Sequence, residues 1–194
     1  MDWDLRYREG DKPWDKGKAT PVLLELTQNT SDYFKTGFKT LVPGCGIGHD
    51  VALLNILGLN AFGLDISETA IKAANETYPD LGDIWLVDNI FQLSGKENSY
   101  DLIWEHTCYC AILPEQRTSY VKSMYNILKP GGYLAGVFFT DTGQAPEIGP
   151  PFATTKDNIR ELFSPNFKLV WESKPSQCYP GRENCEHVFV WRKP

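Results

Sequence analysis

Leu41-Val42-Pro43-Gly44-Cys45-Gly46-Ile47-Gly48 is the stretch that decides the fold of this chain. An apolar run ends at Pro43-Gly44 and a helix-like segment begins at Asp50, so the glycines stand where a strand passes into a helix. A side chain there would block close approach of the backbone to a ligand. The next apolar run ends at Asp65, from which a carboxylate can accept hydrogen bonds from both hydroxyls of a ribose. This spacing predicts a strand–helix–strand unit that binds a nucleoside.

The alternation of strands and helices continues along the chain. Ser67 caps a helix, and a longer amphipathic helix opens at Pro114 and is stopped by Pro130-Gly131-Gly132. Two segments near the end of the chain have a period of two and no helix between them, which predicts an antiparallel hairpin. The predicted strands are 39–42, 61–64, 84–87, 100–104, 133–139, 168–173 and 186–192; the helices are 50–57, 67–78, 114–128 and 155–163; a loop covers 143–151. We expect an α/β fold with a mostly parallel seven-stranded sheet, helices on both faces and the hairpin at one edge.

Length and composition indicate one domain over residues 1–194, with residues 1–35 as an N-terminal segment and helix ahead of the first strand. The chain has 194 residues, 42% of them hydrophobic and 13% aromatic, which suits a single sizeable core. The first sixteen residues are too rich in charge for a secretory signal or an anchor. The longest uncharged stretch, 51–64, is too short to span a bilayer. We therefore expect a cytoplasmic protein without a membrane partner.

Charge and cysteine content exclude several kinds of partner. The net charge is −6, and no run of Lys or Arg forms a stripe for a phosphate backbone, so nucleic acid is not expected. Residues 65–105 hold nine carboxylates against two lysines, which is typical either of solvated faces or of a site for a cationic ligand. Five cysteines without C-x-x-C spacing predict free thiols and no metal site; they are Cys45, Cys108, Cys110, Cys178 and Cys185.

The residues at the end of the glycine turn indicate which kind of nucleoside binds. A dinucleotide site needs a third glycine where this chain has His49, and the acid at Asp50 would repel a pyrophosphate. A nucleoside with a positive centre and no phosphates fits better, and S-adenosylmethionine is that molecule. A nicotinamide-dependent reductase is the alternative, which an absorbance titration with NADH would distinguish.

Six stretches of the chain form a specific combination of motifs: LVPGCGIGHDV (41–51), GLDISETA (63–70), KAANETY (72–78), DLIWEHTCYCAI (101–112), SMYNILKPGG (123–132) and GPPF (149–152). Together they resemble the thiopurine methyltransferase superfamily, and in particular its halide and thiol (thiocyanate) methyltransferase branch. The resemblance implies a Rossmann-like class I methyltransferase fold. It also implies S-adenosylmethionine as cofactor, with S-adenosylhomocysteine as product.

The same resemblance implies the cofactor-binding residues. In the family an aromatic N-terminal segment folds over the cofactor as a lid, and aromatic faces attract a sulfonium through cation–π interactions. Asn89 replaces an aspartate of the plant relatives beside the adenine, which makes its neighbour Asp88 a second candidate. The implied residues are Trp3, Tyr7 and Trp14 of the lid; Gly44, Cys45, Gly46, Asp65 and Ile66 at the turn and ribose; Asp88, Asn89 and Ile90 at the adenine; and His106.

His106 stands where family members place Arg or Tyr near the methyl-transfer site, and Glu105 lies beside it. We predict both as catalytic residues. Imidazole could take the proton of a thiol acceptor, since their reference pKa values are about 6.5 and 8.5, whereas a halide needs no base. The predicted acceptor-binding residues are Trp14, Tyr109, Pro151 and Phe152.

The predicted function is methyl transfer from S-adenosylmethionine to a small soft nucleophile: a thiol, hydrosulfide, thiocyanate or halide. The alternative is a non-catalytic S-adenosylmethionine-binding or metalloid-resistance module, which would bind the cofactor without turnover. The expected partner is a small-molecule substrate only, with the protein a monomer or weak homo-oligomer.

Overall fold

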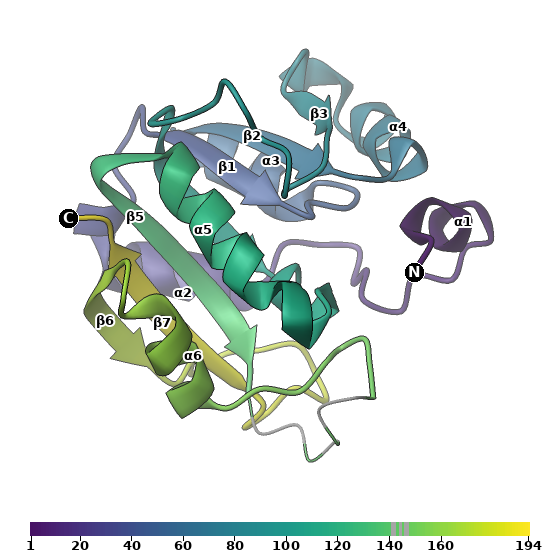
Figure 1. Cartoon of the computed structure of the whole chain (residues 1–194). Helices are drawn as coiled ribbons and strands as arrows, with labels where there is room; N and C mark the ends of the chain where they lie inside the picture. Colours follow the sequence, from purple (N-terminus) through teal and green to yellow (C-terminus); the bar gives the residue numbers. More distant parts are fainter. Residues whose placement is uncertain (141–142, 144, 146–147) are drawn as a thin grey trace.

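The computed structural model describes residues 1–140, 143, 145 and 148–194 and is built around one seven-stranded sheet (Figure 1). The strand order is β3-β2-β1-β4-β5-β7-β6. Strands β1 to β5 run parallel, and β7 lies antiparallel between β5 and β6. The strands are β1 (Lys39–Pro43), β2 (Asn60–Asp65), β3 (Trp85–Val87), β4 (Tyr100–His106), β5 (Leu128–Phe139), β6 (Lys168–Ser173) and β7 (Glu186–Arg192). The predicted Rossmann-like α/β fold with a C-terminal antiparallel hairpin is confirmed.

Helices cover both faces of the sheet (Figure 1). Helices α5 and α6 lie on one face and α2 and α3 on the other, while α4 packs against β2 and β3 and α1 lies beside α4. The helices are α1 (Trp3–Arg8), α2 (Pro21–Asn29), α3 (His49–Ile56), α4 (Glu68–Thr77), α5 (Arg117–Ile127) and α6 (Lys156–Phe163), with short 3-10 turns η1 (Ser31–Tyr33), η2 (Pro79–Leu81), η3 (Tyr109–Ala111) and η4 (Pro114–Gln116). None of the helices in the described ranges has the length and apolar character needed to cross a bilayer.

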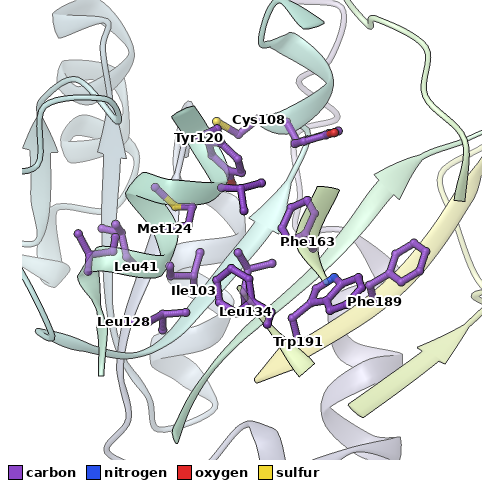
Figure 2. Packing of buried hydrophobic residues seen from close by; sticks show 14 of the residues in the cluster. Leu41, Ile103, Cys108, Tyr120, Met124, Leu128, Leu134, Phe163, Phe189 and Trp191 are labelled. Atoms are coloured by element: carbon purple, nitrogen blue, oxygen red, sulfur yellow. The ribbon is translucent and has the colours of Figure 1, made fainter. Parts of the chain in front are cut away.

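Two buried clusters hold these layers together. Figure 2 shows the first, in which Tyr120 and Met124 of α5 and Phe163 of α6 pack onto Ile103 and Trp191 of the sheet. The second cluster lies between α2, α3 and the opposite face, and is made by apolar residues that include Leu23, Leu54 and Trp104. Each fully buried side chain of this size contributes about 1.5–3 kcal/mol relative to exposure.

Several element boundaries differ from the sequence prediction. The Ser67 cap is confirmed, because its Oγ accepts a hydrogen bond from the amide of Ala70 at 3.0 Å. The prediction that Pro130-Gly131-Gly132 separates a helix from a strand beginning at 133 was wrong, because β5 already begins at Leu128, which pairs with Tyr100. The helix predicted over 114–128 is divided into η4 and α5. The predicted loop at 143–151 lies partly outside the described residues.

Candidate active site

A cavity of about 760 Å³ lies at the carboxyl ends of the parallel strands. Its lining includes Gly44 after β1, Asp65 at the end of β2 and Cys108 after β4, so it opens where the strand order reverses between β1 and β4. This is the position at which open α/β sheets bind their ligands. Of the predicted site residues, the cavity brings together Trp3, Tyr7, Trp14, Gly44, Asp65, Ile66, Asn89, Ile90, Pro151 and Phe152. The described lining residues do not include Cys45, Gly46, Asp88, Glu105, His106 or Tyr109.

Asp65 is held in place by backbone amides of the two segments beside it. Its Oδ2 accepts a hydrogen bond from the amide of Gly46 at 2.9 Å, and its Oδ1 accepts one from the amide of Ser67 at 3.0 Å. Burial raises the pKa of Asp65, and these amides offset only part of that effect. A carboxylate has about four acceptor positions, so further positions remain for hydroxyl donors from the cavity.

The N-terminal segment closes over the glycine turn. The Tyr7 hydroxyl accepts a hydrogen bond from Trp14 Nε1 at 3.1 Å. It lies so close to Gly46 that a Cβ there would come within 2.7 Å of it, and Gly46 has a φ of +56°. Glycine is therefore required at this position both by the backbone conformation and by the approach of Tyr7.

Helix α1 is also fixed to α4. Asp4 Oδ1 accepts hydrogen bonds from Ser67 Oγ at 2.8 Å and from the amide of Thr69 at 2.9 Å, so it satisfies donors at the first turn of α4. These hydrogen bonds lower the pKa of Asp4, with that of the Thr69 amide contributing most. A residue of the predicted lid thereby caps a helix of the sheet domain.

A cation already lies over two of the lid aromatics. The guanidinium of Arg6 is 4.4 Å from the ring centroid of Trp14 and 5.5 Å from that of Trp3. Arg6 Nε also donates to Asp11 Oδ2 at 2.7 Å. These contacts stabilise the folded segment, and the binding of a sulfonium by Trp3 and Trp14 stays a prediction.

The structure distinguishes the two candidate adenine-binding residues after β3, Asp88 and Asn89. Asn89 lines the cavity, and its Oδ1 accepts a hydrogen bond from the amide of Phe91 at 2.9 Å, which leaves the amide nitrogen for a ligand. Asp88 instead pairs with Lys96 Nζ at 2.6 Å, and the hydrogen bond from Lys96 is the main reason that its pKa is lowered. Of the two, Asn89 is therefore the one whose side chain faces the cavity, and its contact with an adenine stays a prediction.

Glu105 organises the loop that follows β4. Glu105 is fully buried. Its Oε1 accepts hydrogen bonds from the amides of Cys108 at 2.9 Å and Tyr109 at 2.8 Å, and its Oε2 accepts one from the hydroxyl of Tyr120. Gly136 of β5 makes room for it, since a Cβ there would lie 2.6 Å from Glu105 Cβ. Burial raises the pKa of Glu105. Its contacts are those of a loop-positioning residue.

His106 takes part in a chain of polar side chains beside the cavity. Its Nδ1 is 2.9 Å from Asp50 Oδ2, and its Nε2 is 3.3 Å from Arg182 Nη1. Arginine can only donate, so we assign the ring proton to Nδ1 and the acceptor role to Nε2. Both ring nitrogens therefore have partners, and the role of His106 as a general base stays a prediction.

The loop after β4 also contributes buried aromatic and thiol groups. Tyr109 is 2% exposed and packs against Phe138 and Phe163 in the core. Cys108 and Cys110 line the cavity, and burial raises the pKa of Cys110 to about 12, so this thiol is protonated at neutral pH. Among the described residues, no three His, Cys, Asp or Glu side chains are grouped to hold a metal ion.

Sequence reasoning missed Arg182 and did not predict the buried contacts of Asp50. Asp50 was interpreted as an acid facing a ligand, but it is 8% exposed and accepts hydrogen bonds from the amide of Thr20 and from Trp104 Nε1, both at 2.8 Å. Arg182 lines the cavity from the loop between β6 and β7. No motif in the sequence marks that loop, and only the register of β7 beside β5 brings it to the site.

The fold is shared with S-adenosylmethionine-dependent methyltransferases. The 1,6-didemethyltoxoflavin-N1-methyltransferase of Burkholderia thailandensis, solved with 1,6-didemethyltoxoflavin and S-adenosylhomocysteine, superposes with a TM-score of 0.79 at 17% identity, covering 99% of this chain and 85% of that one. A S-adenosylmethionine-dependent methyltransferase from Methanosarcina mazei gives 0.71 at 19% identity, covering 91% and 98%. The chain thus has a Rossmann-like fold of the kind that these methyltransferases have.

Sequence comparison gives the family. The thiopurine S-methyltransferase family model matches residues 1–187, and the chain belongs to this family. Thiocyanate methyltransferase 1 of Arabidopsis thaliana is 35% identical over 196 residues, covering 98% of this chain and 84% of that protein. Probable thiol methyltransferase 2 of the same plant is 30% identical over 196 residues with the same coverage. The chain is a methyltransferase that uses S-adenosylmethionine.

The described residues fit that cofactor. The cavity volume is in the range of small-molecule sites, about 300–1,000 Å³. Asp65 has acceptor positions free for ribose hydroxyls, and its burial makes such donors favourable. Asn89 and Ile90 line the cavity where an adenine would lie beyond the ribose site.

Proposed function

We propose that the enzyme transfers the methyl group of S-adenosylmethionine to a small, soft nucleophile: a thiol, hydrosulfide, thiocyanate or halide. The observation that carries this proposal is that one cavity has two chemically different ends. Asp65 and Asn89 suit a nucleoside, while Phe139, Pro151 and Phe152 give the cavity an apolar part that suits a small acceptor. The names of the relatives, thiocyanate and thiol methyltransferases, support the same acceptor class.

In this proposal the chain positions reactants and excludes water. Bound S-adenosylmethionine supplies a methyl group activated by a sulfonium. Asp65 and Asn89 hold the nucleoside, and the lid residues Trp3, Tyr7 and Trp14 cover it. Methyl transfer is an in-line displacement, so alignment and dehydration of the nucleophile can supply most of the rate enhancement. Glu105 acts as a positioning residue, because it holds the amides of the loop that forms one cavity wall.

An acceptor screen tests the proposal. Purified enzyme is incubated with S-adenosylmethionine and, separately, iodide, thiocyanate, hydrosulfide and an alkyl thiol, and both S-adenosylhomocysteine and the methylated product are measured. We expect equal amounts of the two products with at least one acceptor. Cofactor binding without turnover on any acceptor would support the alternative of a non-catalytic S-adenosylmethionine-binding or metalloid-resistance module instead.

We further propose that the substrate is the only partner, that nucleic acid is not bound, and that the enzyme works in the cytoplasm as a monomer or weak homo-oligomer. A net charge of −6 supports the exclusion of nucleic acid. Light scattering across a concentration series measures the oligomeric state.

A further inference from the structure

We propose that His49 is a positioning residue for methyl transfer: through Asp15 it holds Trp14 of the lid over the cavity. This inference rests on the proposed function, in which Trp14 covers the nucleoside. It adds a second attachment of the N-terminal segment to the sheet domain, beyond the attachment that α1 makes to α4. This contact between Asp15 and His49 is called the latch.

Trp14 lies in the part of the N-terminal segment that follows α1. Helix α1 is attached to α4 through Asp4, and from α1 the chain returns to α2 in the body of the protein (Figure 1). Trp14 lies in this returning part, lines the cavity and contacts Trp3 edge-on, with ring centroids 5.4 Å apart. Asp15 follows Trp14 directly in the sequence. A contact that holds Asp15 therefore also holds the backbone that carries the Trp14 ring.

Asp15 has hydrogen-bond partners in its own segment and in the sheet domain. Its Oδ1 accepts hydrogen bonds from the amide of Gly17 at 2.8 Å and from His49 Nε2 at 3.1 Å. Its Oδ2 accepts one from Lys12 Nζ at 3.0 Å. Burial acts to raise the pKa of Asp15, but the hydrogen bonds from Gly17 and Lys12 outweigh it, so the pKa is lowered. Of these three partners, His49 is the one that belongs to the sheet domain.

The glycine turn and two aromatic rings place His49. It is the first residue of α3, directly after Gly48, and its Nδ1 lies 2.6 Å from the hydroxyl of Tyr78 at the end of α4. Tyr78 in turn stacks on Trp85 of β3, with ring centroids 6.2 Å apart and an interplanar angle of 30°. Gly48 makes room for this arrangement, since a Cβ there would clash with the Trp85 ring. The His49 ring is thus held by Tyr78 and presents Nε2 to Asp15.

The latch does not depend on the charge of His49. A carboxylate only accepts hydrogen bonds, so the shared proton is on Nε2, where the imidazolium and one neutral tautomer both carry it. The Tyr78 hydroxyl can donate to Nδ1 or accept from it, so it suits both forms of the ring. The side chains of Asp15 and His49 are 15% and 17% exposed, and a hydrogen bond shielded in this way is stronger than one in water.

The latch joins the lid to the turn that borders the cavity. Gly44 of this turn lines the cavity, and His49 follows the turn directly. A nucleoside between Trp14 and the glycine turn would therefore contact two surfaces that Asp15 and His49 hold together. Loss of the latch should leave both surfaces in place and weaken their joint hold on the ligand. A His49 that only stabilised the start of α3 would instead affect binding independently of Asp15.

A double-mutant cycle in the Kd of S-adenosylhomocysteine tests the latch. His49→Asn keeps a polar group for Tyr78 but is too short to reach Asp15, and Asp15→Ala removes the acceptor. We expect each single variant to raise the Kd by about three- to tenfold. The double variant should stay within about twofold of the weaker-binding single variant. Increases that multiply in the double variant, or an unchanged Kd in His49→Asn, would overturn the latch.

Hydrogen exchange without any ligand gives a second readout. In His49→Asn we expect faster amide exchange over residues 10–17 and unchanged exchange over β1 and β4, which also shows that the variant is folded. His49→Gln restores a donor near the position of Nε2 and should recover part of the lost affinity and of the lost protection. Faster exchange over α3 with residues 10–17 unchanged would overturn the latch and assign His49 to the start of that helix.

His187→Asn is the matched control, because it makes the same change in β7. His187 Nε2 lies 2.8 Å from Glu172 Oε1, and His187 is not among the described residues that line the cavity. This control should bind S-adenosylhomocysteine as wild type does, and an equal loss of affinity would show that the effect of His49→Asn is not specific to the latch. The two proposals fail separately: a wild type that turns over no acceptor refutes the proposed function, while the cycle in S-adenosylhomocysteine affinity still decides the latch.

Discussion

Asp50 is the residue whose contacts connect the most separate parts of the site. Its carboxylate forms hydrogen bonds with the amide of Thr20 before α2, with Trp104 Nε1 in the core and with His106 Nδ1 beside the cavity. Burial alone would raise its pKa, but the interaction with His106 and these hydrogen bonds outweigh burial, so the pKa of Asp50 is lowered. Its ionised form therefore stabilises the fold.

Asp50→Asn should destabilise the protein at neutral pH by about 1–3 kcal/mol, because the new amide group would face buried donors. A carboxylate with a lowered pKa in the folded state contributes stability above its unfolded pKa of about 3.9 and loses it as the pH falls through the folded value. Urea unfolding should therefore show the full difference at about pH 7 and a smaller one below about pH 4.

The exposed Asp80→Asn is the matched control for this measurement, since it makes the same chemical change on the surface of η2. Its stability should follow that of wild type at every pH. A deficit for Asp50→Asn that persists unchanged in acid would contradict the assigned role of the ionised carboxylate.

At the scale of elements, helix α1 joins the lid to the body of the protein. Its docking depends on Asp4 at the first turn of α4 and on Tyr7 at the glycine turn. The sequence predicted the lid aromatics from the family resemblance, yet it gave no sign of Asp4, because a cap supplied from a distant segment has no local spacing. The role of Arg182 in the cavity lining was not predictable for the same reason, because no local spacing in the sequence marks it.

Asp4→Ala should loosen α1 while leaving the sheet intact. We expect faster amide hydrogen exchange over residues 3–16 and weaker S-adenosylhomocysteine binding, with a smaller loss than removal of the Asp65 carboxylate produces. Asp2→Ala removes the N-cap of α1 itself, in which Asp2 Oδ1 accepts a hydrogen bond from the amide of Leu5 at 2.9 Å. This variant leaves the contact between Asp4 and α4 in place. Unchanged exchange over 3–16 in Asp4→Ala would show that α1 is held by other contacts.

Element types were predictable where the apolar period was strong, and the boundaries were not. The parallel strands and the C-terminal hairpin followed from runs of apolar residues. The start of β5 at Leu128 could not be predicted in this way, because Pro-Gly-Gly is typical of a turn. Only the pairing of Leu128 with Tyr100 brings this segment into the sheet. Glu105 could not be recognised as a buried loop anchor, because its space is provided by Gly136 on the neighbouring strand.

At the scale of the whole molecule, the strand order explains why residues far apart in the sequence share one site. Asp65 ends β2, and Asn89 and Cys108 follow β3 and β4. Their meeting at one edge of the sheet could be predicted from parallel topology. The presence of Arg182 in the cavity lining could not be predicted, because β7 brings this residue to the site only through tertiary pairing.

A ligand of this cavity should stabilise the whole fold. S-adenosylhomocysteine at a hundredfold excess over its Kd should add about 2.7 kcal/mol, which for a chain of this size raises Tm by roughly 5–11 °C. Differential scanning calorimetry measures the shift. NADH at the same concentration should give no shift, and a shift with NADH alone would favour the nicotinamide-dependent alternative.

Isothermal titration with S-adenosylhomocysteine tests the central claim most directly, because the proposed binding of the cofactor through Asp65 underlies every other step. Wild type, Asp65→Ala and the exposed control Asp80→Ala are compared. We predict binding by wild type and Asp80→Ala, and an affinity about 5- to 150-fold lower for Asp65→Ala, the loss expected for charge-assisted hydrogen bonds of about 1–3 kcal/mol. Equal affinities for wild type and Asp65→Ala would contradict the assigned site.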